Sequence, residues 1–157
     1  VKLVVRAGNS FEFKLNSFTI VSSISNHHGL LILFEQIESF VQPGDRLRIV
    51  QIDIMSAHES YCSKQHANDL IPVIIYGSAY LDVSSIEINS LLLENIASEM
   101  VGKASNSSKI DDINDDEYPD LLVKFDANNK CLSTSFGFAA LRGYLTDGTI
   151  INGIDEF

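Results

Sequence analysis

The sequence is poor in basic residues and has no tryptophan. Its 157 residues include 11 lysines and arginines against 21 aspartates and glutamates, which gives a formal net charge of −10. A nucleic-acid binder needs clustered Lys and Arg side chains to contact phosphates, so this composition argues against nucleic acid as a partner. The missing tryptophan removes the side chain that sugar-stacking platforms use most readily. The five tyrosines are therefore expected mainly to pack half-buried in the fold.

Long apolar runs are absent, and cysteine is scarce. No stretch reaches the roughly 20 apolar residues of a membrane-spanning helix. The opening VKLVVRAGNS has no signal-peptide core, because Arg6 interrupts its short apolar run. We therefore expect a mature or excised soluble piece with no membrane span. The two cysteines, Cys62 and Cys131, permit either one disulfide or two buried free thiols, and their number and spacing leave both open.

Acidic residues are concentrated in the second part of the chain. Residues 1–50 carry five basic and four acidic side chains, a net charge of +1, whereas residues 51–157 carry six basic and seventeen acidic ones, a net charge of −11. This shift predicts a boundary near Gln51. The expected organisation is a set of N-terminal β-strands in residues 1–50, packed on a β module formed by residues 51–157. No Pro- or Ser-rich linker marks the boundary, so a free N-terminal domain is not expected.

Alternation of apolar and polar residues dominates the pattern. In FEFKLNSFTIV, Phe11, Phe13 and Leu15 share one face, as in a half-buried strand, and DRLRIVQIDI repeats this alternation. Asp147-Gly148 between two apolar segments predicts a hairpin. Helical signals are few, and MVGKASNSSKID at residues 100–111 is expected to form a loop. The predicted fold is all-β, an antiparallel β-sandwich or a partly open barrel with long polar loops.

The stretch DDINDDEYPD, residues 111–120, contains six acidic side chains in ten residues. Oxygen-bearing residues alternate along it, and a hard cation such as calcium binds several such oxygens on a tightly wrapped loop. The sequence therefore predicts a calcium site. The expected metal ligands are Asp112, Asn114, Asp116, the backbone carbonyl of Tyr118, and Asp120. A solvated acidic turn that precedes a buried strand is the alternative.

Two positions depart from the EF-hand form of a calcium loop. The twelfth position, which is acidic in an EF-hand, is Val123, so an EF-hand helix pair is not expected. The sixth position, where glycine permits a sharp turn, is Glu117. A non-glycine residue in the left-handed conformation costs about 1 kcal/mol, which is expected to weaken the site.

Six segments follow one another in a characteristic order between Ile52 and Asp155. They are IDI at 52–54, Cys62, LIPVIIYGS at 70–78, LDVSSIEINSLLL at 81–93, DINDDEYPDLL at 112–122 and LRGYLTDGTIINGID at 141–155. This order resembles a module of secreted and cell-surface bacterial and archaeal proteins. Its members show I-D-I-K-P-G before a cysteine, G-V-I-P-V-A-I, F-D-V-S-S-I-D, D-V-N-G-D-G-x-x-D-L and D-G-T-x-I-x-G-x-D. The chain departs from the pattern at Met55-Ser56-Ala57, at Asp69 and at Glu117.

The resemblance implies a function and a location. Members are typically exported, which implies a secreted or cell-surface protein and favours a Cys62–Cys131 disulfide. It also implies a non-catalytic accessory module, stabilised by calcium, that serves surface display or adhesion. The alternative is a glycan- or matrix-binding head of an adhesin, whose partners would be an extracellular protein or glycan and a second copy of the chain in a homo-oligomer. A hydrolase is the least favoured function, since no compact acid, base and nucleophile grouping stands out.

Overall fold

A computed structural model describes ten stretches of the chain, and all structural statements below refer to them. The stretches are 2–5, 11–15, 18–22, 45–55, 70–94, 96–98, 100–101, 105–106, 108–126 and 138–156. They contain strands β1 to β14 and two short 3-10 helices, and within this part of the chain there is no α-helix. The all-β prediction is therefore confirmed. The predicted Cys62–Cys131 pair lies outside the described residues.

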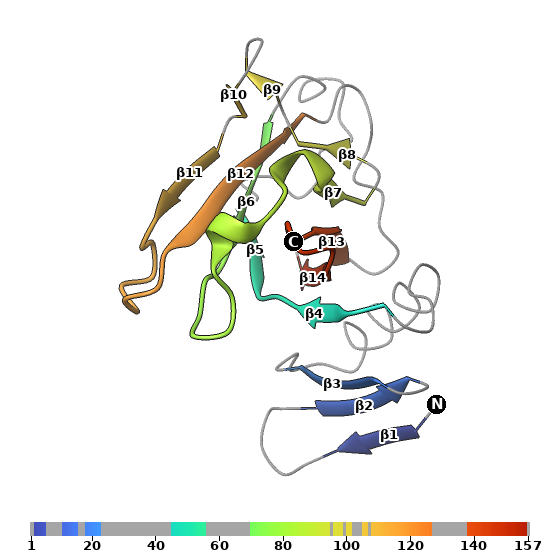
Figure 1. Cartoon of the computed structure of the whole chain (residues 1–157). Coiled ribbons are helices and arrows are strands. Elements are labelled where there is room, and N and C mark those ends of the chain that lie inside the picture. Colours follow the sequence, from blue (N-terminus) through green and yellow to red (C-terminus); the bar gives the residue numbers. More distant parts are fainter. Residues whose placement is uncertain are drawn as a thin grey trace.

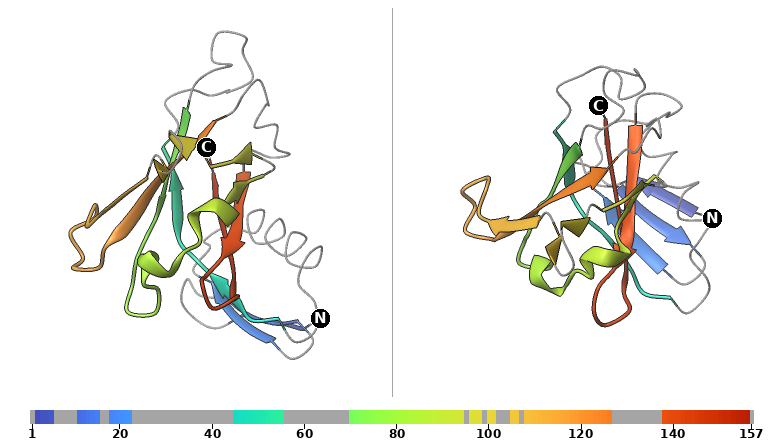
Figure 2. Two further views of the ribbon diagram at one scale, coloured as in Figure 1. Left: turned by 45° about the horizontal axis from the view of Figure 1, so that its top comes forward. Right: turned by 90° about the horizontal axis from the view of Figure 1, so that it is seen from above.

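Two facing sheets form the body of the protein (Figure 1 and the left view of Figure 2). One sheet has the order β11 (Ser108–Asp111), β12 (Asp120–Asp126), β6 (Leu70–Ile75), β5 (Ile52–Ile54). The other has the order β4 (Leu47–Ile49), β14 (Ile150–Glu156), β13 (Phe138–Tyr144), β7 (Leu92–Leu93), β8 (Ile96–Ala97). Neighbouring strands are antiparallel except β4 and β14, which are parallel. The sheets do not close into a barrel, and a sandwich describes them.

Two smaller sheets correct the expected strand boundaries. The alternating stretch FEFKLNSFTIV forms two strands instead of one, and they belong to a meander of β1 (Lys2–Val5), β2 (Phe11–Leu15) and β3 (Phe18–Ser22). The expected loop at 100–111 instead carries the short pair β9 (Met100–Val101) and β10 (Ser105–Asn106), followed by β11. Its polar composition concealed these strands, because β11 is an edge strand whose four residues are all exposed. No helix in the described part has the length and apolar character needed to cross a membrane.

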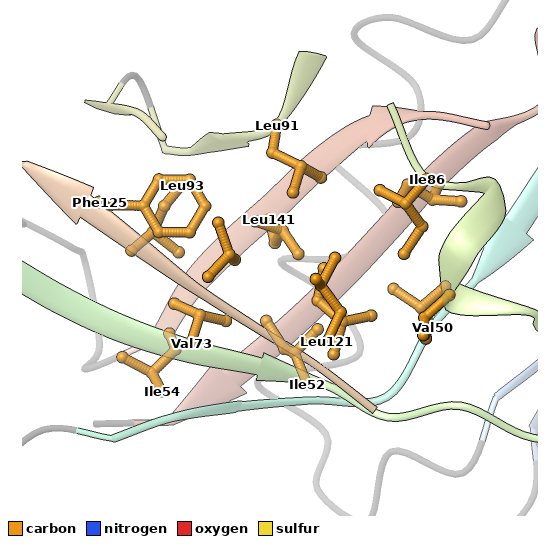
Figure 3. Packing of buried hydrophobic residues seen from close by; sticks show 14 of the residues in the cluster. Val50, Ile52, Ile54, Val73, Ile86, Leu91, Leu93, Leu121, Phe125 and Leu141 are labelled. Carbon is orange, nitrogen blue, oxygen red and sulfur yellow. The ribbon is translucent and has the colours of Figure 1, made fainter. Parts of the chain in front are cut away.

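The core lies between the two large sheets. On β12, Leu121, Val123 and Phe125 are fully buried and alternate with partly exposed neighbours, as strand geometry requires. Leu141 of β13 and Ile151 of β14 face them from the other sheet and are also fully buried. Figure 3 shows Leu121, Phe125 and Leu141 packed among other buried side chains of the core. Burying each one contributes about 1.5–3 kcal/mol, so this layer of apolar residues is a major source of the stability of the sandwich.

The chain changes sheets between β4 and β5, where the sequence suggested one continuous strand. The N–H of Val50 donates to the carbonyl of Asn152 (2.9 Å), while the N–H of Tyr76 donates to the carbonyl of Gln51 (3.0 Å). Gly153 permits this crossing, because a Cβ there would lie 2.7 Å from Ile52 Cγ2 and 3.0 Å from the Val50 carbonyl oxygen. β4 of the N-terminal region thus pairs with β14 of the C-terminal module. The domain boundary near Gln51 stays a prediction.

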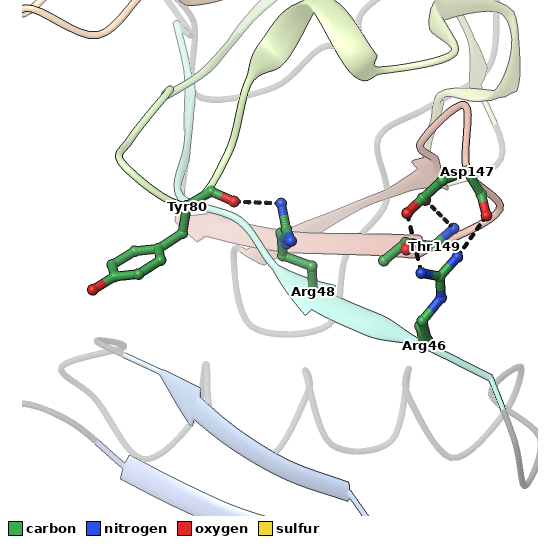
Figure 4. A network of polar contacts seen from close by, with 5 residues as sticks. All are labelled: Arg46, Arg48, Tyr80, Asp147 and Thr149. Atoms are coloured by element: carbon green, nitrogen blue, oxygen red, sulfur yellow. Dashed lines mark hydrogen bonds and ion pairs between the residues drawn. The ribbon is translucent and has the colours of Figure 1, made fainter.

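The predicted hairpin at Asp147-Gly148 is confirmed, since it joins β13 to β14. The carboxylate of Asp147 accepts the N–H of Thr149 (2.9 Å), and Gly148 adopts φ 81°. The guanidinium of Arg46 lies 3.2 Å from the same carboxylate and donates to the Asp147 carbonyl (2.7 Å). Figure 4 shows this network, together with Arg48, which donates to the Tyr80 carbonyl. The contacts tie the parallel edge strand β4 to the hairpin.

Asp147 is expected to titrate below an ordinary aspartate. The hydroxyl of Thr149 hydrogen-bonds its carboxylate and lowers its pKa most, the Thr149 N–H adds to this, and Arg46 and Arg48 contribute further. Since the folded pKa is the lower one, the stabilisation is present above the unfolded value of about 3.9 and is lost as the pH falls through the folded value. Thr149→Val keeps the side-chain shape and removes the hydroxyl. It is expected to raise the Asp147 pKa, measured by carboxyl-carbon NMR.

Asp82 provides the internal control for this titration. Its pKa is lowered by the hydroxyl and N–H of Ser84, which are far from Thr149 in sequence and belong to another turn. The Thr149→Val change is therefore expected to leave the Asp82 titration unchanged. An unaltered Asp147 pKa in the variant would show that the Thr149 hydroxyl does not lower the pKa of this carboxylate.

Candidate metal centre

The acidic stretch forms an exposed turn between β11 and β12. Residues 112–119 lie at the end of the first sheet and are all exposed to solvent. Figure 1 shows the turn at the left of the molecule, before the start of β12. The sheet thus positions the turn, because β11 and β12 are paired in register up to Asp111 and Asp120.

Three of the predicted ligands are drawn together by hydrogen bonds within the turn. The two carboxylate oxygens of Asp112 accept the N–H groups of Asp116 (3.1 Å) and Glu117 (3.0 Å). The amide oxygen of Asn114 also accepts the Asp116 N–H (3.2 Å), and its NH₂ donates to the Asp116 carboxylate (3.0 Å). Asp116 in turn accepts the N–H of Tyr118 (2.9 Å). These contacts coil the backbone so that the oxygens of Asp112, Asn114 and Asp116 lie on one turn.

The sharpness of the turn is visible in its backbone. Glu117 adopts φ 73° and Asp115 adopts φ 58°, both in the left-handed region. The sixth position of a calcium loop usually has a glycine with a positive φ. Glu117 occupies that position here and has a positive φ, as expected from the sequence. A glycine would adopt the same conformation without the steric cost of a Cβ, so the turn carries strain of about 1 kcal/mol at this position.

Asp120 differs from the other predicted ligands because its side chain is fully buried. One of its oxygens accepts the N–H of Gly77 (2.9 Å) and the other accepts the N–H of Ile113 (2.9 Å). At Gly77 a Cβ would lie 2.1 Å from the carbonyl oxygen of Pro119, so the two chain segments meet backbone to backbone. Asp120 therefore fastens the acidic turn to the segment that follows β6.

The donor set is chemically suited to a hard cation. It consists of carboxylate and amide oxygens, the ligands that calcium prefers, and Asp112, Asn114 and Asp116 are exposed. Within the described stretches no three His, Cys, Asp or Glu side chains are grouped closely enough to hold a metal ion. The predicted set depends on an amide and a carbonyl oxygen in addition to its carboxylates. Asp112, Asn114, Asp116 and the backbone carbonyl of Tyr118 would hold the ion, with the buried Asp120 supporting the turn beneath them.

The tyrosines follow only in part the expectation that they pack half-buried. Tyr76 does, since it is partly buried and its hydroxyl donates to Asp53 (3.3 Å). Tyr118 and Tyr144 expose 41% and 49% of their surface, and Tyr80 exposes 85%. Each lies in a turn or at a strand end, where strand periodicity gives no guide to which side chain faces solvent. Tyr61 lies outside the described residues.

Comparison with known proteins identifies no relative. No family model, no curated protein and no solved structure matches the chain.

Proposed function

We propose that this chain is a non-catalytic β module, stabilised by calcium at its acidic turn, that serves display or adhesion in a secreted or cell-surface protein. The observation that supports it is the coiling of the turn around Asp112, Asn114 and Asp116, whose side-chain oxygens accept hydrogen bonds from N–H groups of the turn while the three residues stay exposed to solvent. The resemblance of residues 52–155 to an exported module agrees with it.

Calcium is expected to stabilise the folded chain. An ion that binds only the folded state, at about 100 times its dissociation constant, adds about 2.7 kcal/mol to the free energy of unfolding. Calorimetry in millimolar calcium and in chelator measures the difference as a rise in Tm. Asp116→Ala is expected to abolish the rise, because Asp116 lies at the centre of the hydrogen bonds of the turn.

Asp115→Asn is the matched control for Asp116→Ala. It removes one charge from the same turn, and asparagine tolerates the left-handed backbone that residue 115 adopts. The control is expected to retain most of the rise in Tm with calcium. If Asp115→Asn lost as much of the rise as Asp116→Ala, the ion would be attracted by the overall negative charge of the turn and not bound by Asp116. No Tm difference between calcium and chelator in the unaltered chain would exclude the site.

The glycan-binding alternative is favoured by one observation, the exposure of Tyr80, Tyr118 and Tyr144. An exposed phenol offers an apolar face to a sugar ring and a hydroxyl for hydrogen bonding. A glycan array, combined with the solution mass of the protein, tests this alternative. A monomer that binds no glycan on the array would count against it.

A further inference from the structure

A pocket of about 230 Å³ lies on the second large sheet, on the face directed away from the core. Leu141 and Ile151 point into the core, so their neighbours along β13 and β14 point to the opposite face. The pocket lies among those neighbours and the adjoining η2 (Ile88–Ser90) and β7. Its lining residues are Ser90, Leu92, Arg142, Gly143, Tyr144 and Ile150.

The wall of the pocket is held in place by backbone contacts. The hydroxyl of Ser90 donates to the carbonyl of Glu87 (2.7 Å) and accepts the N–H of Tyr144 (2.8 Å). Gly143 allows this close packing, since a Cβ there would lie 2.7 Å from Leu91 Cδ2 and 3.2 Å from Ser90 Oγ. The Glu87 N–H also donates to the Tyr144 carbonyl (2.9 Å). The pocket is therefore formed before any ligand arrives, which lowers the cost of binding.

The described part of the lining combines the guanidinium of Arg142 with apolar surface and a phenol. Arg142 supplies a planar guanidinium, a group suited to paired hydrogen bonds with a carboxylate. Leu92 and Ile150 provide apolar surface, and Tyr144 is half exposed. A ligand that matches this lining has an apolar face, polar edges and a negative charge.

The size of the pocket restricts such a ligand to a single small ring. Drug-sized ligands occupy pockets of about 300–1,000 Å³, and this one is smaller. A six-membered sugar ring presents an apolar face of C–H groups and hydroxyls at its edge, and in a uronate it also carries a carboxylate. We propose that the pocket binds a uronate residue of an acidic glycan, with Arg142 pairing with the carboxylate and Tyr144 covering the ring. This makes the glycan-binding alternative specific and does not depend on calcium.

Titration with trigalacturonate, followed by NMR in the presence of chelator, tests the proposal. Resonances of Leu92, Gly143 and Tyr144 are expected to shift and to saturate in the millimolar range. The methyl-esterified trisaccharide, which lacks the charge, is expected to bind on the order of tenfold more weakly, and so is the Arg142→Gln variant. Arg142→Lys, which keeps the charge without the planar fork, is expected to fall between them.

The remaining variants and ligands keep the test decisive. Tyr144→Ala is expected to weaken binding even if Arg142→Gln does not fold, whereas Tyr80→Ala removes an exposed tyrosine that does not line the pocket and is expected to bind normally. Equal binding of acetate would reduce the pocket to a simple carboxylate site and overturn its assignment to a sugar. Absence of shifts, or equal binding by Arg142→Gln, also overturns it. Glycan binding that persists without Arg142 leaves the alternative function standing, and the calcium effect on Tm is tested separately.

Discussion

Replacing Asp120 by alanine is expected to lower the free energy of unfolding by about 4 kcal/mol, even in the absence of calcium. The side chain is fully buried and accepts the backbone N–H groups of Gly77 and Ile113, each at 2.9 Å. Hydrogen bonds to a charged group contribute about 1.5–3 kcal/mol each, and the change also leaves two N–H donors without an acceptor. Since small domains are stable by about 5–15 kcal/mol, this is a large fraction. Urea unfolding in chelator measures it.

Two further variants separate the structural role of Asp120 from metal binding. Asp120→Asn keeps the shape and one acceptor but turns an NH₂ group toward the other N–H, so a loss of about 2 kcal/mol is expected. Asp116→Ala, whose side chain is exposed, is expected to change stability in chelator by less than about 1 kcal/mol. If Asp120→Ala and Asp116→Ala had equal effects in chelator, the anchoring role of Asp120 would be wrong.

The strand pattern of the large sheets could be predicted from the sequence because it depends on local alternation. β6, β12, β13 and β14 all lie where branched aliphatic residues alternate or cluster between turn residues. The Asp147-Gly148 turn could be predicted for the same reason, since the left-handed backbone of Gly148 is a local requirement. The passage from β4 to β5 could not be predicted, because it depends on the approach of Gly153 to Val50 and Ile52 from a distant part of the chain.

The structure of the acidic turn could be predicted only in part from the sequence, for a similar reason. The spacing of Asp112, Asn114 and Asp116 is a local property, and the structure brings these three side chains together. The burial of Asp120 depends on Gly77, which lies 43 positions away in the chain. A spacing pattern cannot distinguish a carboxylate that faces an ion from one that binds two backbone N–H groups. Arg142 was missed because its pocket forms only where three separate segments meet.

Several residues in the LDVSSIEINSLLL and LRGYLTDGTIINGID segments have structural roles in this fold. Asp82 accepts the N–H of Ser84 at the start of η1 (Val83–Ser85), and Asp155 accepts the N–H of Ile54 (2.8 Å) and so joins β14 to β5. Gly153 permits the crossing of the same strands. These roles explain why such residue types suit their positions whatever the chain binds.

Replacing Asn152 by leucine is expected to raise the free energy of unfolding by about 1–2 kcal/mol. Asn152 lies on β14 between Arg142 and Ile49 and is fully buried, and neither polar atom of its side-chain amide has a hydrogen-bond partner in the part of the chain that the structure describes. Burying an amide without a partner costs about 1–3 kcal/mol, and leucine has a similar volume without polar atoms. In urea unfolding the midpoint is expected to rise at constant slope, because the surface exposed on unfolding changes little.

Asn152→Asp and Asn152→Ala test whether the unpartnered amide is the cause of the expected rise in the free energy of unfolding. Aspartate has the same shape but would place a charge in the same buried position, so a loss of several kcal/mol is expected. Alanine removes the polar group but leaves a cavity. The stability lost to the cavity is expected to offset the stability gained by removing the unpartnered amide. A stabilised leucine variant together with a destabilised aspartate variant would locate the cost in the unpartnered amide. Destabilisation by leucine would mean instead that Asn152 is held by a bound water in this sheet, since a buried water satisfies such groups and would be displaced.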